Sequence, residues 1–165
     1  MRPLSPANVS IDLYDGLASL PHFNPDLDAL ELPIVRDFIC KVRNSEGLII
    51  STPEYAHGVP GTLKNAFDWL VSSDAFIKKP FMLLNASSRA IYAQQSLIEI
   101  LKTMSGILIE QACATIPLLG KDKEYAEILN MAENREILRR SVALFVSEIK
   151  KAHQARMSAQ PFDAA

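Results

Sequence analysis

Cysteine and excess positive charge are both scarce in this sequence. Its 165 residues include two cysteines, Cys40 and Cys113, which lie far apart and lack the CxxC spacing typical of zinc and dithiol redox sites. We interpret both as buried thiols in a reducing compartment. The formal net charge is -2, whereas nucleic-acid-binding domains display a concentrated basic face, so nucleic acid is not expected as a partner.

Long apolar runs are absent too. No stretch is long enough to span a bilayer, and the first residues lack the charged and then apolar pattern of a secretory signal. We therefore expect a cytoplasmic protein with no membrane partner. The composition, 48% hydrophobic and 22% charged, is that of a globular domain. We assign residues 1–153 to a single domain and expect residues 154–165 to form a frayed tail.

A pattern of alternating strands and helices runs along the chain. Val9–Leu13 alternates apolar and polar residues and predicts a short strand, while the prolines of Leu20–Asp28 predict an extended surface loop. Apolar residues at helical spacing predict an amphipathic helix from Pro33 to Arg43. Short apolar runs predict a strand buried on both faces at Glu46–Ser51 and another buried strand at Phe81–Asn85. Further along we predict helices at Thr62–Val71, Ile91–Met104 and Asn134–Lys151, a weaker strand inside Ile107–Pro117 and a polar connection through Lys121. This order predicts an α/β fold with a doubly wound parallel sheet in three α/β/α layers.

The segment between the Glu46–Ser51 strand and the next helix has more special residues than a simple connection needs. Its prolines and glycines, among them Pro53, Gly58 and Gly61, fix or permit unusual backbone angles, so main-chain N–H groups can face a ligand. Ligands of parallel sheets bind at the carboxyl ends of the strands, where Asn85–Ser88 also lies. We predict a site for a planar, hydrogen-bonding ligand between these two loops; the alternative is that the first segment is only a tight turn.

No side chain stands out as a catalytic group. His57 fits a surface position about as well as a functional one. Lys64 and Asp68 are four residues apart on one helix face, and we interpret them as a solvated or subunit-facing pair. A hydrolase is excluded because the chain has no G-x-S-x-G elbow and no plausible Ser-His-Asp order.

Several motifs of this sequence closely resemble the signature of the NADPH-dependent FMN reductase family, which includes quinone, chromate and azo-dye reductases. The motifs are Thr52-Pro53-Glu54-Tyr55, Gly58-Val59-Pro60-Gly61, Leu63-Lys64-Asn65-Ala66 and Asp68-Trp69. Upstream, Ile11–Asp15, Leu20-Pro21 and Phe23–Leu27 resemble the family's second strand and the loop after it, and further support comes from Pro80–Ser88, Gln94, Leu97 and Leu101. The resemblance covers roughly Val9 to Leu119. It implies a flavodoxin-like fold with FMN at the carboxyl ends of the strands.

The resemblance also implies which residues bind FMN. Residues Pro53, Glu54, Tyr55, Ala56 and Gly58 would border the flavin ring on one side, largely through backbone groups, and Ser87 and Ser88 would lie on the other side. NADPH or NADH would give hydride to flavin N5 in a ping-pong cycle, with no catalytic side chain. The acceptor would be a quinone, a flavin, chromate or an azo compound. A homodimer or homotetramer is expected, in which Phe67 and Trp69 either contact a neighbour or pack in the core.

Three departures from the family pattern matter. Ala56 stands where many members carry Asn, and Arg89–Tyr92 is shorter and less glycine-rich than usual. The family's opening strand and its Gly-Ser-x-Arg-x-x-Ser loop, which holds the FMN phosphate at a helix N-terminus, have no counterpart here. The missing strand would lie between those at Ile11 and Leu48.

Two explanations fit that missing unit of roughly 30 residues. Met1 is an internal methionine of a longer protein, or the chain is a truncated relative. We expect poor FMN affinity if the chain is as written. The competing functional hypothesis is a non-catalytic relative that forms oligomers or serves as a binding module, with weak or no FMN binding.

Overall fold

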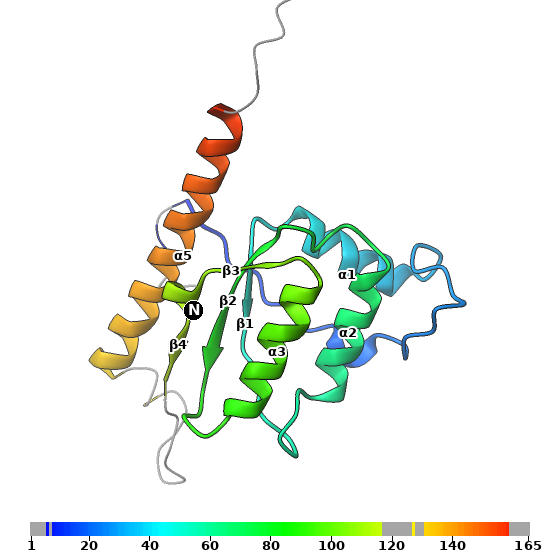
Figure 1. The fold of residues 1–165 in the computed structure, drawn as a ribbon, viewed down its shortest axis with the longest axis horizontal. Helices are drawn as coiled ribbons and strands as arrows, with labels where there is room; N and C mark the ends of the chain where they lie inside the picture. Colours follow the sequence, from blue (N-terminus) through cyan, green and yellow to red (C-terminus); the bar gives the residue numbers. More distant parts are fainter. Residues whose placement is uncertain (1–5, 7, 117–126, 128–130, 159–165) are drawn as a thin grey trace, which may run out of the picture.

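A parallel sheet of short strands lies between two helical layers in the computed structural model, which describes residues 6, 8–116, 127 and 131–158 (Figure 1). This arrangement confirms the predicted α/β class. The elements in chain order are η2 (Leu17–Ser19), α1 (Pro33–Asn44), β1 (Leu48–Ile50), α2 (Gly61–Val71), β2 (Pro80–Asn85), α3 (Ile91–Thr103), β3 (Ile107–Leu108), η3 (Glu110–Ala112), β4 (Ala114–Thr115) and α5 (Ala132–Ser158).

Strand β2 lies at the centre of the sheet. On one side it pairs with β1, with Leu48 opposite Phe81. On the other side it pairs first with β3 and then with β4, and every pairing is parallel. The predicted weak strand between 107 and 117 is therefore two short strands interrupted by the 3-10 turn η3. At the interruption the Leu83 N–H donates to Cys113 Sγ at 3.3 Å, which replaces a ladder bond.

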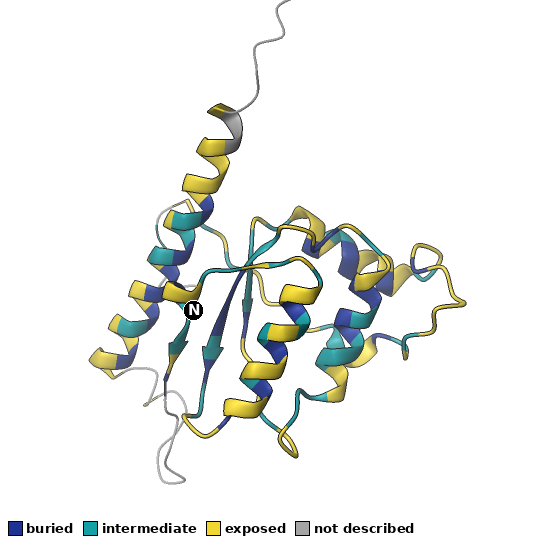
Figure 2. Ribbon diagram, in the orientation of Figure 1, coloured by how far each residue is buried: buried dark blue, intermediate teal, exposed yellow. Residues whose placement is uncertain are grey.

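The side chains of β2 alternate between the two helical layers, as strand geometry requires. Phe81 and Leu83 belong to the buried cluster that contains the inner faces of α1, α2 and α3. Met82 points to the opposite face and packs with Phe145 and Ile149 of α5. The buried positions on the helices face the sheet in Figure 2, and the predicted three-layer arrangement is confirmed.

Helix α5 approaches the start of β1 closely because residue 47 is glycine. A Cβ atom at Gly47 would lie 2.7 Å from Phe145 Cζ, a distance that real side chains do not tolerate. The helix continues through Ser158, beyond the predicted end at Lys151 and into the first residues of the segment expected to fray. The polar connection through Lys121 lies outside the described residues. In the described part of the chain, no helix is both long and apolar enough to cross a membrane.

The predicted strand at Val9–Leu13 is wrong. These residues form irregular backbone, and Leu13 is 84% exposed. A strand needs a neighbour for its N–H and C=O groups, and the described strands all pair with β2 rather than with this segment. For the same reason β1 lies at an edge of the described sheet, and Leu48 and Ile49 are only half-buried instead of fully buried.

Helix α2 holds the surface loop of residues 20–32 through two polar side chains on one helix face. Asn65 Oδ1 accepts the Phe23 N–H at 2.7 Å, and Asn65 Nδ2 donates to the Pro21 carbonyl at 2.9 Å. Trp69 Nε1 donates to the same carbonyl at 2.8 Å, and the Phe23 ring meets the Trp69 ring edge-on. Trp69 and Phe67 are buried inside the protein, so their packing in the core is confirmed.

We expect Asn65→Ala to lower the free energy of unfolding by about 2 kcal/mol, because it removes one acceptor and one donor from partly buried backbone groups. Urea denaturation followed by the fluorescence of Trp69, the single tryptophan, measures this change. The matched control is Gln95→Ala, at an exposed position of α3, with an expected change within about 0.5 kcal/mol. Equal effects of the two substitutions would contradict the role given to Asn65.

Candidate functional site

Two loops lie at the carboxyl ends of neighbouring parallel strands. The first loop is residues 51–60, between β1 and α2, and the second loop is residues 86–90, between β2 and α3. Because β1 and β2 are parallel, both loops leave the sheet at the same edge, where α/β proteins bind ligands. The structure thus brings together the two segments singled out in the sequence.

The first loop closes into a two-residue hairpin turn. The Tyr55 N–H donates to the Gly58 carbonyl at 3.2 Å, and the Gly58 N–H donates to the Tyr55 carbonyl at 2.9 Å. Ala56 and His57, between them, have φ angles of 49° and 58°. Two such left-handed residues are characteristic of a type I′ turn, which favours Asn followed by Gly. Each non-glycine residue costs about 1–2 kcal/mol in this region, so the turn is strained.

The strained turn is tied to the start of α3 by two contacts. Glu54 Oε2 accepts the N–H of Ala93, the third residue of α3, at 2.8 Å. The His57 ring stacks on the Tyr92 ring, with 4.4 Å between centroids and 27° between planes. An N–H in the first turn of a helix has no partner within the helix, and the side chain of the N-cap residue, Ala90, supplies none. Glu54 therefore caps a helix 39 residues away in the sequence.

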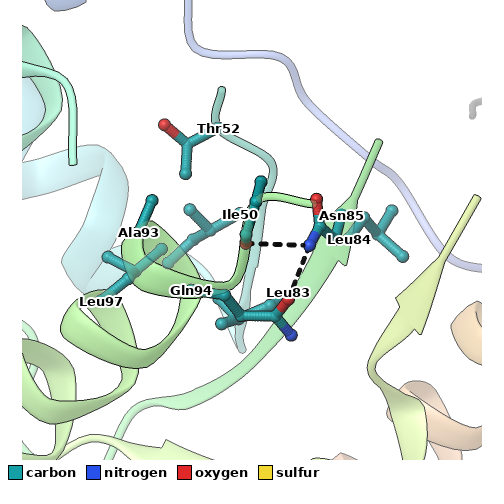
Figure 3. A pocket seen from close by; sticks show the side chains of 9 residues that line it. Ile50, Thr52, Leu83, Leu84, Asn85, Ala93, Gln94 and Leu97 are labelled. Carbon is teal, nitrogen blue, oxygen red and sulfur yellow. Dashed lines mark hydrogen bonds between the residues drawn. The ribbon is translucent and has the colours of Figure 1, made fainter. Parts of the chain in front are cut away.

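The second loop is organised by Asn85, the last residue of β2, whose side chain is buried. Asn85 Oδ1 accepts the Ser87 N–H at 3.0 Å. Asn85 Nδ2 donates to the Ala90 carbonyl at 3.2 Å and to Gln94 Oε1 at 2.7 Å, as Figure 3 shows. In the sequence, Asn85 directly follows four apolar residues of a predicted strand, and this position was the available signal that its amide would organise the loop. The prediction of the site did not include it.

The predicted site residues all lie on these two loops, with different degrees of access. Pro53, Tyr55 and Ala56 are exposed, whereas Glu54 and Gly58 are half-buried. In the second loop Ser88 is exposed, and Ser87 is half-buried with its Oγ accepting the Arg89 N–H at 3.2 Å.

Main-chain N–H groups are left without an acceptor at only part of the first loop. Those of Tyr55 and Gly58 are engaged in the hairpin. Within the described residues, the N–H groups of Glu54, Ala56 and His57 have no hydrogen-bond acceptor. The donors available to a ligand are therefore those at the turn itself.

The space between the bases of the two loops is too small for a flavin. Its volume is about 10 Å³, room for roughly one water. It is lined by Ile50, Thr52, Leu83, Leu84, Asn85, Ala90, Ala93, Gln94 and Leu97 (Figure 3). A planar ligand must therefore lie outside this space, across the exposed surfaces of the loops.

The described residues fit the ring of FMN better than its phosphate. The N–H groups of Ala56 and His57, which are exposed residues and have no acceptor in the described chain, suit the edge of a flat, hydrogen-bonding ring. The start of α3 would otherwise attract a phosphate, but the carboxylate of Glu54 already occupies it and repels a second anion. The donor set thus supports ring recognition, and α3 does not serve as a phosphate anchor.

Thiol and metal chemistry find no support at the two loops. Cys40 and Cys113 are half-buried rather than fully buried as predicted. Burial raises the pKa of the Cys113 thiol and outweighs the opposing hydrogen bond from the Leu83 N–H, and the charge of Glu110 adds a smaller increase, so the reactive thiolate is disfavoured. The described residues contain no group of three or more potential metal ligands. Lys64 and Asp68 form an ion pair with each other along α2.

Comparison with known proteins gives consistent matches. The sequence matches the model of the NADPH-dependent FMN reductase family over residues 2–118. It is 32% identical over 160 residues to the NADH:(hydroxy)cinnamate reductase subunit CrdA of Vibrio ruber, across 88% of this chain and 76% of that protein. It is 39% identical over 69 residues to a 2-hydroxy-1,4-benzoquinone reductase of a Burkholderia species, across 42% of this chain and 37% of that protein.

One solved structure resembles this chain closely in fold. The flavoenzyme NAD(P)H:(acceptor) oxidoreductase (FerB) of Paracoccus denitrificans superposes with a TM-score of 0.77. The alignment covers 91% of this chain and 85% of that one, at 24% sequence identity. A likeness at this identity concerns the fold alone, and it confirms the flavodoxin-like class.

We expect Asn85→Asp to lower the free energy of unfolding by about 2–3 kcal/mol at neutral pH, because a buried carboxylate would face the Ala90 carbonyl without a proton to donate. Such a site raises the folded-state pKa of the introduced carboxyl above its unfolded value. The folded state then binds the proton more tightly, so the loss should shrink as the pH falls. Urea titrations from pH 4 to 8, chosen to span about this window, test the trend, and a pH-independent loss would contradict it.

We expect Ala56→Asn to raise the free energy of unfolding by about 1 kcal/mol, since Asn tolerates the left-handed region better than Ala. Chemical denaturation measures the change. The matched control is Ala143→Asn, at an exposed position inside α5, where the lower helix propensity of Asn should cost about 0.5 kcal/mol. A loss of stability at both positions would show that the turn is not strained.

Proposed function

Because the chain belongs to the NADPH-dependent FMN reductase family, we propose that it holds the ring of FMN across the two loops and uses NAD(P)H to reduce a small-molecule acceptor. FMN and NAD(P)H are the cofactors that membership of this family implies. The observation that carries the proposal is the strained turn of the first loop. Among the described residues, the N–H groups of Ala56 and His57 in this turn have no acceptor, and the turn lies at the edge of the sheet where α/β proteins bind ligands.

The role of the protein in this proposal is to position and to stabilise. When bound, FMN supplies the redox chemistry, accepting a hydride at N5 and passing the electrons to a second substrate. The N–H groups of Ala56 and His57 would donate to acceptor atoms of the ring, and such fixed dipoles stabilise developing negative charge. Tyr55 and Ser88 would complete the surface around the ring, with Pro53, Glu54, Gly58 and Ser87 shaping the backbone. No side chain is required as an acid or a base.

An open surface also suits a ping-pong cycle. The two loops offer an exposed face rather than an enclosed pocket, so nicotinamide and acceptor can occupy the same place in turn. A quinone is the acceptor class we favour, because one relative is a 2-hydroxy-1,4-benzoquinone reductase. A flavin, chromate or an azo compound would fit the same open face. We further propose a cytoplasmic homodimer or homotetramer.

A second candidate is a non-catalytic relative that binds FMN weakly or not at all and serves as an oligomer-forming or binding module. The observation that favours it is the carboxylate of Glu54 at the start of α3, which leaves that helix unable to hold the phosphate. The same experiment decides between the two candidates.

The test is to titrate the purified chain with FMN and with riboflavin while following flavin fluorescence, and then to add NADPH and 1,4-benzoquinone. The proposal predicts saturable binding of both flavins, with affinities within about threefold of each other because the ring carries the recognition. It also predicts oxidation of NADPH that depends on flavin and quinone together. Binding of neither flavin would support the second candidate, and FMN binding more than about tenfold tighter than riboflavin would reveal a phosphate anchor.

A further inference from the structure

The contact between Glu54 and α3 joins a strained segment to a rigid one. Ala56 and His57 are held in the left-handed region immediately after Glu54 and Tyr55. Ala93, which receives the Glu54 carboxylate, is 1% exposed and lies on the buried face of α3. That face is fixed in the core further along by Leu97 and Leu101. The helix is therefore the fixed partner, and the loop is the part that would move.

We propose that Glu54 is a positioning residue that holds the first loop in its strained shape by capping α3. The part of this proposal that concerns FMN binding rests on the proposed function. Two left-handed residues that are not glycine cost free energy in the folded state, and such backbone persists only where its surroundings impose it. Two hairpin bonds close the turn within the loop, and the cap bond from Glu54 is the hydrogen bond that ties this turn to α3.

The geometry favours a carboxylate in this place. The N-terminus of a helix carries partial positive charge, so an anion at the third amide is stabilised by the helix as well as by the hydrogen bond. In the described chain, α3 receives no other side-chain cap, since its N-cap residue is Ala90. The loop and the helix thus depend on one another: the loop supplies the missing acceptor, and the helix fixes the loop.

The same geometry argues against a direct role of the Glu54 side chain in binding the ring. Its Oε2 atom is engaged with Ala93 of α3, below the exposed face of the turn. The stack of His57 on Tyr92 is a second tie, but both rings are exposed, so we expect it to contribute less. Removing the cap should therefore loosen the turn first, and the affinity for the ligand should fall only as a consequence.

The experiment compares Glu54→Ala with Glu54→Gln and measures two quantities. The first is amide hydrogen exchange of Tyr55, Gly58 and Ala93 in the absence of flavin, followed by NMR. Glu54→Ala should speed these exchange rates about five- to tenfold and weaken FMN binding by a similar factor, as expected for the loss of one cap. Glu54→Gln keeps an acceptor oxygen and should stay within about threefold of the unaltered chain in both quantities.

The matched control is Glu99→Ala, which removes the same charge from an exposed position of α3 and should change neither quantity. A second-site variant gives the sharper test. Adding Ala56→Asn to Glu54→Ala makes the turn favourable by itself, so amide exchange at Tyr55 and Gly58 should return to within about threefold of the unaltered chain while Ala93 exchange stays fast. If Glu54→Ala does not fold, Glu54→Asp, whose side chain is one methylene shorter, takes its place.

The outcomes separate cleanly. Unchanged exchange at Tyr55 and Gly58 in Glu54→Ala would overturn the proposal, and so would a failure of the added Ala56→Asn to slow the exchange of these two amides again. The proposal would also be overturned if Glu54→Gln weakened FMN binding and sped amide exchange as much as Glu54→Ala does. The loss of the negative charge, rather than the loss of the capping hydrogen bond, would then explain both effects. If the unaltered chain binds no flavin, the proposed function fails, whereas the exchange rates still decide the role of Glu54.

Discussion

Every described strand pairs with β2, and both helical layers pack on it, so the rest of the fold depends on this one strand. Its alternating side chains divide the core into two clusters. Its last residue, Asn85, then turns the chain with three side-chain hydrogen bonds. The same strand that builds the core therefore also sets the position of the second loop and of the start of α3.

The candidate site combines that rigid base with a strained loop. Left-handed backbone at Ala56 and His57 is unfavourable by itself, yet within the described residues it leaves the N–H groups of these two exposed positions without an acceptor, and so available to a ligand. Strain of this kind is found where surrounding contacts over-determine the backbone, often at functional sites. Here those contacts come from α3, so the two loops behave as one unit. A flat ligand that meets this unit contacts a preformed surface.

The sequence predicts the regular elements well and the contacts between them poorly. Helical spacing located α1, α2 and α3 because each buries one apolar face. The strand at Val9–Leu13 was wrong, since alternation reports a fitting pattern but not the presence of a neighbouring strand. The rule that ligands bind at the carboxyl ends of parallel strands, together with the prolines and glycines of the first loop, located both loops. The side-chain role of Glu54 could not be foreseen, because its partner is a backbone group far along the chain.

The central claim is that a flavin ring lies on the outward face of the first loop at the carboxyl ends of the strands. An NMR titration of the ¹⁵N-labelled chain with FMN tests it most directly. The account predicts the largest amide shifts at Ala56, His57 and Ser88, with smaller shifts where the loops meet α3. Shifts gathered instead at the amino ends of the strands, around Gly47 and Pro80, would contradict it.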